Sequence, residues 1–490
     1  MKGLPSAIPA AKCVSLVCLL LFASVVANAQ QPPSPVLNFD GIGAIAAGIN
    51  VIPPSTNLAV GATQVVQVVN GAYAVYDKSG NSVAGPSPIH NLFASLPGGS
   101  SPCETTEGGS PIVLYDQIAG RWLISQIVFP TSTNGVTSNH VCIAVSKTNL
   151  ATGGSNNFNA YDYDRGSNLP GNPKFGVWPD AYFFSADTYA GYNGSGAGTF
   201  IGAEACAFER TKMLAGQAAS AVCFQGNTSL SGMLPSNLDG SALPPSGSPN
   251  FFLQLGANSL SLYKFQADFA KPQKSKFTGP TSIPVASFTK APSQAAIPQP
   301  QSSQLLEGLG DSLMYRLSYR NFGAYQSLVV DHTVQVNGPG QTGIRWYEIR
   351  NPNSSNPNSP PTVTQQGTYS PDTSTYRWLG SVTQDKQGNM LLGYSASSSS
   401  LNPSIYYTGR LNTDPPNQME GEGVIQVGGG SQTNTGGALR GRWGDYSSVA
   451  VDPVDNCTFW FATEYLPYTA DTPPAFWNTR IATVKFPGCQ

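Results

Sequence analysis

Three aspartates occupy similar places in the sequence, each directly before a short apolar segment. They are Asp180 in a Trp-Pro-Asp phrase, Asp311 in a Gly-Asp phrase and Asp445 in a Trp-Gly-Asp phrase. Carboxylates that converge repel one another unless a cation or hydrogen-bond donors compensate. The three therefore predict a site for a hard cation such as Ca²⁺, or for a polar ligand, if the fold brings them together. The alternative is that each carboxylate accepts backbone N–H bonds in its own turn.

The residue types of a glycan-cleaving site are also present, without a complete catalytic pattern. A sialidase-type site needs a Tyr–Glu pair, an acid and several arginines, and the chain offers Tyr315, Glu204 and Glu464. No Ser-x-Asp-x-Gly-x-x-Trp motif occurs. An ordinary glycosidase needs only two suitably placed carboxylates, which sequence spacing does not establish. The arginines near expected strands have a second interpretation, as ties between loops or blades; they are Arg316, Arg320, Arg345, Arg377 and Arg442.

Other nucleophile and metal patterns are incomplete. The phrase Gly310–Leu313 has the letters of GDSL hydrolases, but it precedes a strand in mid-chain and only His332 follows it. A serine without a positioned base is a poor nucleophile. His90, His140 and His332 share no metal-binding spacing, and we expect each to make local hydrogen bonds.

The composition indicates the class of fold that must position these residues. Only 11% of the residues are charged, 10% are aromatic, and the chain has 52 Gly and 40 Pro. Many aromatics and few charges favour a buried core over disorder, and frequent Gly and Pro disfavour a helical bundle. We therefore predict an all-β fold. A net charge of −2 without a basic stripe gives no support for nucleic-acid binding, and the glycines at 41–43 lack the strand–helix context of a dinucleotide site.

A recurring strand–turn–strand unit predicts the architecture. The positions directly before the expected strands are spaced by about 65 residues on average, and they are Asn57, Ser110, Asp180, Asn250, Asp311, Gly380 and Asp445. Seven such units predict a β-propeller of about seven four-stranded blades, with six or eight blades or a pair of sandwiches as alternatives. Residues Val36–Phe39 and Thr479–Phe486 are the expected closing strands. We expect the recurring tryptophans to pack between blades, or to stack on a carbohydrate where exposed; they are Trp122, Trp178, Trp346, Trp378, Trp443 and Trp460.

The first 29 residues have the features of a signal peptide. Lys2 and Lys12 precede an apolar run at 13–26, and an Ala-x-Ala site ends at Ala29. Cleavage there leaves a single propeller domain at 30–490 with six cysteines, an even number that predicts disulfides in an exported chain. Six cysteines allow 15 connectivities. Pairing between sequence neighbours is favoured: Cys103–Cys142, Cys206–Cys223 and Cys457–Cys489.

Several of these phrases resemble a family of uncharacterised secreted bacterial propeller-like proteins. The phrases are Pro53–Asn70, Lys174–Asp180, Leu309–Arg316 and Arg442–Ser447, and the resemblance covers nearly all of the mature chain. It implies a propeller and export, but no reaction. The chain departs from the family pattern at positions 55 and 58, where Ser and Leu replace Asp and Gly. The Trp-Gly-Asp-Tyr phrase is also distantly similar to sialidase-like propellers.

The predicted function is binding of an extracellular glycan, peptide or surface partner through the loop face and the channel mouth. The long loops Thr131–Asn139, Asn351–Pro361 and Gly428–Gly437 would form that face. The alternative is a glycan-processing hydrolase or lyase that uses an Asp-lined mouth. We expect a secreted or periplasmic monomer with no membrane span after signal cleavage.

Overall fold

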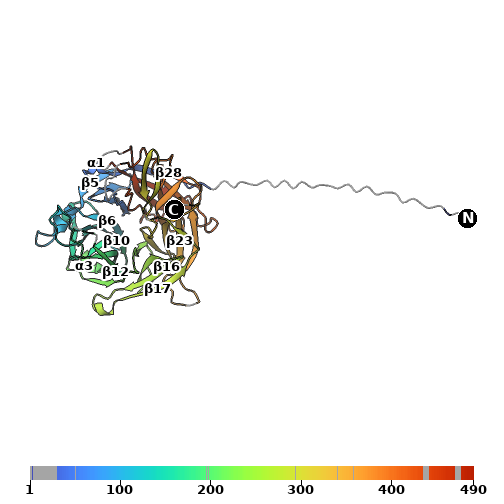
Figure 1. The fold of residues 1–490 in the computed structure, drawn as a ribbon. Helices are drawn as coiled ribbons and strands as arrows, with labels where there is room; N and C mark the ends of the chain where they lie inside the picture. The colour runs from blue at the N-terminus through green and yellow to red at the C-terminus, as the bar shows by residue number, and fades with distance from the viewer. Residues whose placement is uncertain are drawn as a thin grey trace.

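The protein is a closed ring of β-sheet blades around a central axis (Figure 1). The computed structural model describes residues 3 and 30–490, apart from 50, 195, 197, 293, 339, 357, 434–440 and 470–475. The expected signal peptide at 1–29 lies outside the described residues, except for Gly3. The predicted all-β propeller is confirmed, and the strands within these residues form seven four-stranded blades. No helix in the described part of the chain is long and apolar enough to span a membrane.

The first four blades each take four consecutive strands. Blade 1 contains β2 (Asn57–Val60), β3 (Gln64–Val69), β4 (Ala72–Asp77) and β5 (Ser82–Pro88). Blade 2 contains β6 (Gly109–Asp116), β7 (Arg121–Val128), β8 (His140–Ser146) and β9 (Phe158–Asp164). Blade 3 contains β10 (Leu169–Val177), β11 (Tyr182–Ala190), β12 (Thr199–Phe208) and β13 (Ala221–Gln225). Blade 4 contains β14 (Leu234–Asp239), β15 (Asn250–Leu255), β16 (Ser259–Gln266) and β17 (Lys276–Pro284).

The remaining blades follow an insertion. Blade 5 contains β21 (Leu317–Asn321), β22 (Gln326–Gln335), β23 (Thr342–Arg350) and β24 (Thr362–Tyr369). Blade 6 contains β25 (Tyr376–Gln384), β26 (Met390–Ser397), β27 (Ser404–Arg410) and β28 (Gly423–Gln426). Blade 7 contains β29 (Ser448–Val451), β30 (Thr458–Tyr465), β31 (Asn478–Lys485) and β1 (Leu37–Gly43). Short helices decorate the loops: α1 (Ala44–Ala47), α2 (Pro102–Thr105), α3 (Arg210–Leu214), η1 (Ile89–Phe93), η2 (Gly154–Asn157) and η3 (Pro272–Lys274).

The first strand of each blade lies nearest the axis. Each of these inner strands contacts the inner strand of the next blade, all the way around the ring, and β14 pairs with β21 in parallel. The inner strands therefore run in one direction, and their starts meet at one end of the channel. We call that end the N-terminal mouth, and the end where the inner strands finish the C-terminal mouth.

The N-terminal and C-terminal strands close the ring, as the sequence predicts. Strand β1 pairs antiparallel with β31 from Leu37 opposite Thr483 to Gly43 opposite Asn478. The two ends of the chain therefore share blade 7, with β1 as its outermost strand. The three expected disulfides are present, and Cys457–Cys489 ties the turn before β30 to the segment after β31.

The tryptophans belong to the core. All six that the repeat singles out are at most 2% exposed. Trp178 packs edge-on against Tyr319 and Phe251 from the two following blades, and Trp378 of blade 6 packs against Trp443 before blade 7. Each large buried side chain of this kind contributes about 1.5–3 kcal/mol. Packing between blades is confirmed, and stacking of these rings on a carbohydrate is excluded by their burial.

An insertion separates blades 4 and 5. The inner strands of these blades begin 83 residues apart, at Leu234 and Leu317, the longest such interval in the ring. Residues 285–316, here called the cap segment, include β18 (Thr289–Lys290), which pairs with β22, and the hairpin of β19 (Ala295–Gln299) and β20 (Ser302–Glu307). The hairpin is anchored by Ile297 and Leu306, which are fully buried.

Candidate functional site

The N-terminal mouth holds a polar cavity of about 630 Å³. Asp311 and Asp445 line it, and each precedes an inner strand, β21 and β29 respectively. Asp180 lies elsewhere, in the turn between β10 and β11 at the C-terminal end of its inner strand. The structure therefore brings two of the three predicted aspartates together and separates the third.

The separation has a simple cause in the repeat. An aspartate before an apolar strand can precede the inner strand of a blade or its second strand. Asp180 precedes the second strand of blade 3, as Asn250 begins the second strand of blade 4. The two ends of a β-hairpin lie at opposite mouths, so the same local pattern leads to opposite ends of the channel.

Two further carboxylates line the cavity, and the sequence pattern did not identify them. Asp187 lies near the end of β11, opposite Gly171 of β10. Glu307 is the last residue of β20 in the cap segment, which also supplies Lys290 and Asp311. The only sequence signal for Glu307 is the long interval between the inner strands of blades 4 and 5. Nothing in the alternation of β11 distinguishes Asp187 from other strand residues.

Arg442 joins two of the four carboxylates. It forms an ion pair with Asp445 and lies 3.1 Å from Glu307 Oε2. Asp445 adopts a left-handed backbone (φ +49°), and the amide of the preceding Gly444 donates to buried Glu464 at 2.7 Å. The second oxygen of the Asp445 carboxylate is buried without a hydrogen-bond partner among the described residues.

The other two carboxylates are not neutralised in this way. The described ion pairs include neither Asp187 nor Asp311; the nearest compensation for Asp187 is the amide of Gly232 at 2.9 Å. Burial raises the pKa of Asp187, and the charge of Asp311 raises it further against the opposing effect of Lys174. Burial likewise raises the pKa of Glu307, with Asp311 again adding to the shift and Arg442 opposing it. The mouth therefore holds an electrostatically coupled acidic group.

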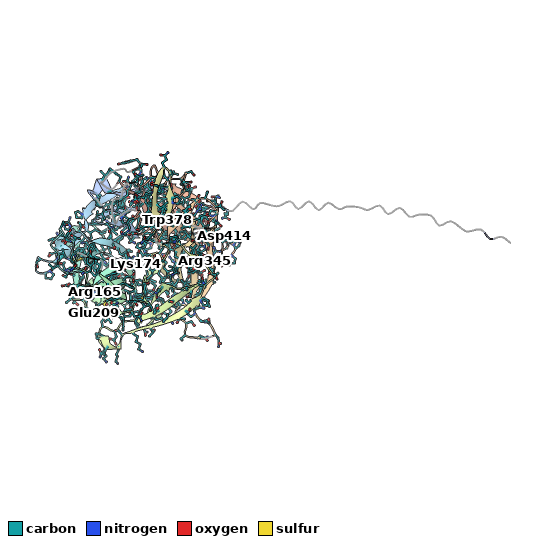
Figure 2. The ribbon with its side chains drawn as sticks, in the orientation of Figure 1. Arg165, Lys174, Glu209, Arg345, Trp378 and Asp414 are labelled. Carbon is teal, nitrogen blue, oxygen red and sulfur yellow. A yellow bond between two sulfur atoms is a disulfide. The ribbon has the colours of Figure 1, made fainter. Side chains whose placement is uncertain are left out.

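A buried lysine lies beneath this group, near the centre of the ring (Figure 2). Lys174 Nζ is 4.0 Å from the ring centroid of Tyr446 and donates to the carbonyl of Pro173 at 3.2 Å. Burial lowers the pKa of Lys174 to about 7, although the charge of Asp187 opposes this. Lys174, Asp187 and Tyr446 line a smaller adjoining cavity. The ion pairs in the part of the chain that the structure describes do not include Lys174, so its ammonium group has no carboxylate partner there.

Aromatic rings form part of the cavity wall. Tyr189 of β11 and Phe200 of β12 contact each other with centroids 5.5 Å apart, and both line the cavity with Tyr446. All three are half-buried. Half-buried rings beside carboxylates offer an apolar face and hydrogen-bond acceptors to the same ligand.

The predicted Ca²⁺ site has no assembled ligand set at the mouth. Within the described residues, two groups of three His, Cys, Asp or Glu side chains bring their ligand atoms within 4.8 Å of one another, and neither contains a mouth carboxylate. Both groups include disulfide-bonded cysteines, which have no thiolate to offer. Ca²⁺ binding therefore stays a prediction.

The residues considered for a sialidase-type site are buried in separate places. Tyr315 donates to the carbonyl of Phe175, Glu204 pairs with Arg165, and Glu464 accepts the Gly444 amide. None of the three lines the mouth cavity. The structure therefore does not gather them into one site.

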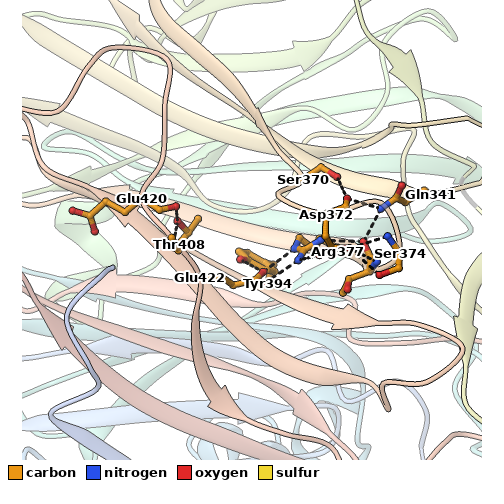
Figure 3. Close-up of polar contacts among 11 residues, drawn as sticks. Gln341, Ser370, Asp372, Ser374, Arg377, Tyr394, Thr408, Glu420 and Glu422 are labelled. Atoms are coloured by element: carbon orange, nitrogen blue, oxygen red, sulfur yellow. Dashed lines mark hydrogen bonds and ion pairs between the residues drawn. The ribbon is translucent and has the colours of Figure 1, made fainter. Parts of the chain in front are cut away.

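Most of the arginines tie structural elements together. Arg377 forms ion pairs with Asp372 and Glu422, and Tyr394 donates to Glu422 at 2.6 Å (Figure 3). Three others donate to backbone or side-chain oxygens of neighbouring segments: Arg316 at the end of the cap segment, and Arg320 and Arg345 of blade 5. Of the five arginines considered, Arg442 is the one that lines the cavity.

The comparisons with known proteins agree with the fold alone. No family model and no curated protein matches the chain. Solved structures of similar shape include an α-L-arabinofuranosidase from Lactobacillus brevis, 12% identical with a TM-score of 0.31, covering 76% of this chain and 89% of that one. The haemagglutinin-neuraminidase of parainfluenza virus 5 is 9% identical with a TM-score of 0.37, covering 82% and 92%. The WD40 domain of SCAP from fission yeast is 9% identical with a TM-score of 0.32, covering 88% and 82%. Likenesses at this level carry no inference about the site.

Proposed function

We propose that the protein is an exported propeller that binds a glycan at the N-terminal mouth of its channel. The observation that carries the proposal is the cavity in which half-buried aromatic rings stand beside four carboxylates. Sugar hydroxyls donate hydrogen bonds to carboxylate oxygens, and the apolar faces of sugar rings pack on aromatic side chains. A concave site with a few convergent polar groups is the usual form of a small-ligand site.

The charge of the mouth narrows the class of glycan. Four carboxylates face two cations, Arg442 and Lys290, and Arg442 is already paired with Asp445 and Glu307. An anionic sugar would meet the unpaired carboxylates of Asp187 and Asp311. The site therefore favours neutral or amino sugars over uronic or sialic acids.

Export is part of the proposal. The Ala-x-Ala site at Ala29 follows an apolar run, and three disulfides form between the six cysteines that follow it. Disulfides persist in oxidising compartments outside the cytoplasm. A glycan is a ligand that such a protein meets there.

The test is binding of the purified chain to an array of neutral, amino and acidic oligosaccharides, followed by calorimetry on the best ligand. We expect Asp311→Asn to weaken binding by about 10-fold or more, the loss of a charge-assisted hydrogen bond. Asp180→Asn is the matched control at the opposite mouth and should bind as the wild type does. Binding of peptides but no glycan, or equal losses in both variants, would overturn the proposal.

Hydrolysis of the bound glycan is the second candidate. The observation that favours it is that Asp187 and Glu307 line one cavity. Burial raises the pKa of both carboxyls, which is the direction of shift that a general acid needs. The same incubations are examined for cleaved products. Turnover that Asp187→Asn abolishes would replace the binding role by catalysis, whereas binding without products leaves the protein a lectin-like binder.

A further inference from the structure

A second polar constellation lies in blade 2, apart from the channel mouth. Ser138 Oγ is 2.9 Å from His140 Nε2, and His140 Nδ1 is 2.8 Å from Asp162 Oδ1. The other oxygen of Asp162 accepts a hydrogen bond from Ser101 Oγ at 2.7 Å. None of these residues lines the mouth cavity. The three side chains thus form an unbroken line from a hydroxyl through an imidazole to a carboxylate.

The positions of the base and the carboxylate follow from the sheet register. His140 begins β8 and Asp162 lies in β9, with Cys142 opposite Asp162 and His140 opposite Asp164. Residues two apart on a strand point to the same face, so His140 and Asp162 are diagonal neighbours on one face of blade 2. Ser138 stands two residues before His140, at the end of the loop between β7 and β8.

A stapled helix holds the carboxylate in place. Ser101 caps α2, where its Oγ accepts the amide of Cys103 while Glu104 accepts the amide of Ser101. The Cys103–Cys142 disulfide fastens α2 to β8, two residues from His140. Asp162 is therefore fixed by His140 on one side and by a rigid capped turn on the other.

The arrangement gives each group a chemical role. A carboxylate on Nδ1 selects the tautomer whose Nε2 lone pair faces the serine, which is the condition for Nε2 to accept the hydroxyl proton. His140 is only 5% exposed, whereas Ser138 is half-buried and reaches the surface. A purely structural tie between His140 and Asp162 needs no hydroxyl on the second nitrogen. In this group the residue that reaches the surface is Ser138, whose hydroxyl is the nucleophile.

We propose that Ser138, activated by His140 and held in register by Asp162, accepts an acyl group from small carboxylic esters. Ser138 Oγ bonds to the carbonyl carbon while its proton passes to Nε2. That proton then goes to the alcohol oxygen as the ester C–O bond breaks. Water attacks the acyl-serine, gives a proton to Nε2, and the acid leaves as the proton returns to Ser138.

The reaction has a defined dependence on pH. Burial disfavours the imidazolium form, but the hydrogen bond and charge of Asp162, with the charge of Asp164, outweigh burial and raise the pKa of His140. On α2, the nearest ionisable group is Glu104, which is occupied by the Ser101 amide. Because Nε2 must be unprotonated to accept the serine proton, the acylation rate should rise with pH and level off above the ordinary histidine range.

The experiment is labelling of the full chain with a fluorophosphonate, which bonds to an activated serine and releases fluoride, followed by peptide mass mapping. We expect a single label on Ser138, none in Ser138→Ala, and a rate at least about 100-fold lower in His140→Gln. Ser132→Ala removes an exposed serine of the same loop and should be labelled as the wild type is.

Labelling spread over several exposed serines would overturn the proposal, as would a His140→Gln rate equal to that of the wild type. The melting temperature of each variant shows whether a loss of labelling comes from misfolding or from the loss of a reactive group. Ser138→Ala should have the melting temperature of the wild type, because it deletes one partly exposed hydroxyl. Asp162→Asn is the second test, since it keeps the side-chain shape but disturbs the tautomer. Its labelling should be slow with the fold intact, and wild-type labelling in this variant would likewise contradict the assignment.

Discussion

The two mouths of the channel use the same residue type in opposite ways. At the C-terminal end of the inner strands, Asp116 and Asp385 are fully buried, and each accepts two backbone amides of its own turn. At the N-terminal mouth, Asp187 and Asp311 have no ion-pair partner among the described residues and line an open cavity. Asp116 and Asp385 therefore stabilise their turns, whereas Asp187 and Asp311 are available to a ligand.

Two cations, Arg210 and Lys174, show a similar contrast. Arg210 at the C-terminal end donates to both oxygens of Asp116, at 2.6 and 3.0 Å, and Tyr182 adds a third hydrogen bond at 2.8 Å. Lys174 near the N-terminal mouth has two backbone carbonyls and the Tyr446 ring instead of a carboxylate. Arg210 therefore has a carboxylate partner that fixes it in the structure, whereas Lys174 beside the candidate site has none among the described ion pairs.

The largest effect on stability should come from removing a paired carboxylate at the C-terminal end of the inner strands. Asp116→Asn removes the charge opposite the buried guanidinium of Arg210 and weakens two turn hydrogen bonds. We expect the free energy of unfolding in urea to fall by about 3–5 kcal/mol. Asp311→Asn, at an exposed position without an ion pair, should change it by less than about 0.5 kcal/mol. Similar losses in both variants would remove the distinction between the mouths.

Replacing Lys174, which has no ion-pair partner among the described residues, should instead raise the free energy of unfolding. The folded protein holds Lys174 at a pKa of about 7, below its unfolded value, so the folded state binds fewer protons between these values and wild-type stability rises with pH there. Lys174→Met keeps the length of the side chain and removes this dependence. We expect it to be more stable than the wild type by about 1–3 kcal/mol at neutral pH. Thermal unfolding across that pH range checks this, and a destabilised variant with an unchanged pH slope would contradict it.

The smallest expected effect is on the pH dependence of stability, to which Asp455 and Asp187 should contribute in opposite directions. The Thr458 hydroxyl and the amides of Cys457 and Thr458 outweigh burial and lower the pKa of Asp455 to about 2, so its stabilising contribution is lost as pH falls from the ordinary Asp range toward 2. The pKa of Asp187 is raised, so its cost disappears as pH falls through the folded-state value. Asp455→Asn and Asp187→Asn should therefore alter the acid limb of unfolding free energy in opposite directions, by about 1 kcal/mol or less. Changes of the same sign would show that the two carboxylates have similar surroundings.

Features that depend on repetition and pairing in sequence were predictable. Seven strand–turn units, the closing strands around Phe39 and Thr479, and disulfides between neighbouring cysteines all follow from periodicity and composition. Asp180 was misplaced because a residue before a second strand looks like one before an inner strand. Spacing therefore identifies hairpins but not which of their ends faces the cavity.

Features that depend on register across strands were not predictable. Asp187 lies at the mouth because β11 runs antiparallel to β10 and pairs Asp187 with Gly171, near the start of that inner strand. His140 was expected to make local hydrogen bonds, and it does, but its partner Asp162 is 22 residues away and aligned only by the pairing of β8 with β9. Sequence spacing alone does not reveal such diagonal neighbours.

The shared blade of the two termini determines when the ring can be completed during synthesis. Strand β1 is the first of the described strands to be made and its partner β31 the last, and Leu37 lies 446 positions before Thr483, whose side chain accepts its amide. Contacts of such long sequence separation form slowly. The nascent chain therefore emerges as an open arc of blades, with β1 unpaired until β31 has been made. A truncation that removes β31 would leave blades 1 to 6 with all of their own strands, but it would reduce blade 7 to β29 and β30 and leave β1 without a partner strand.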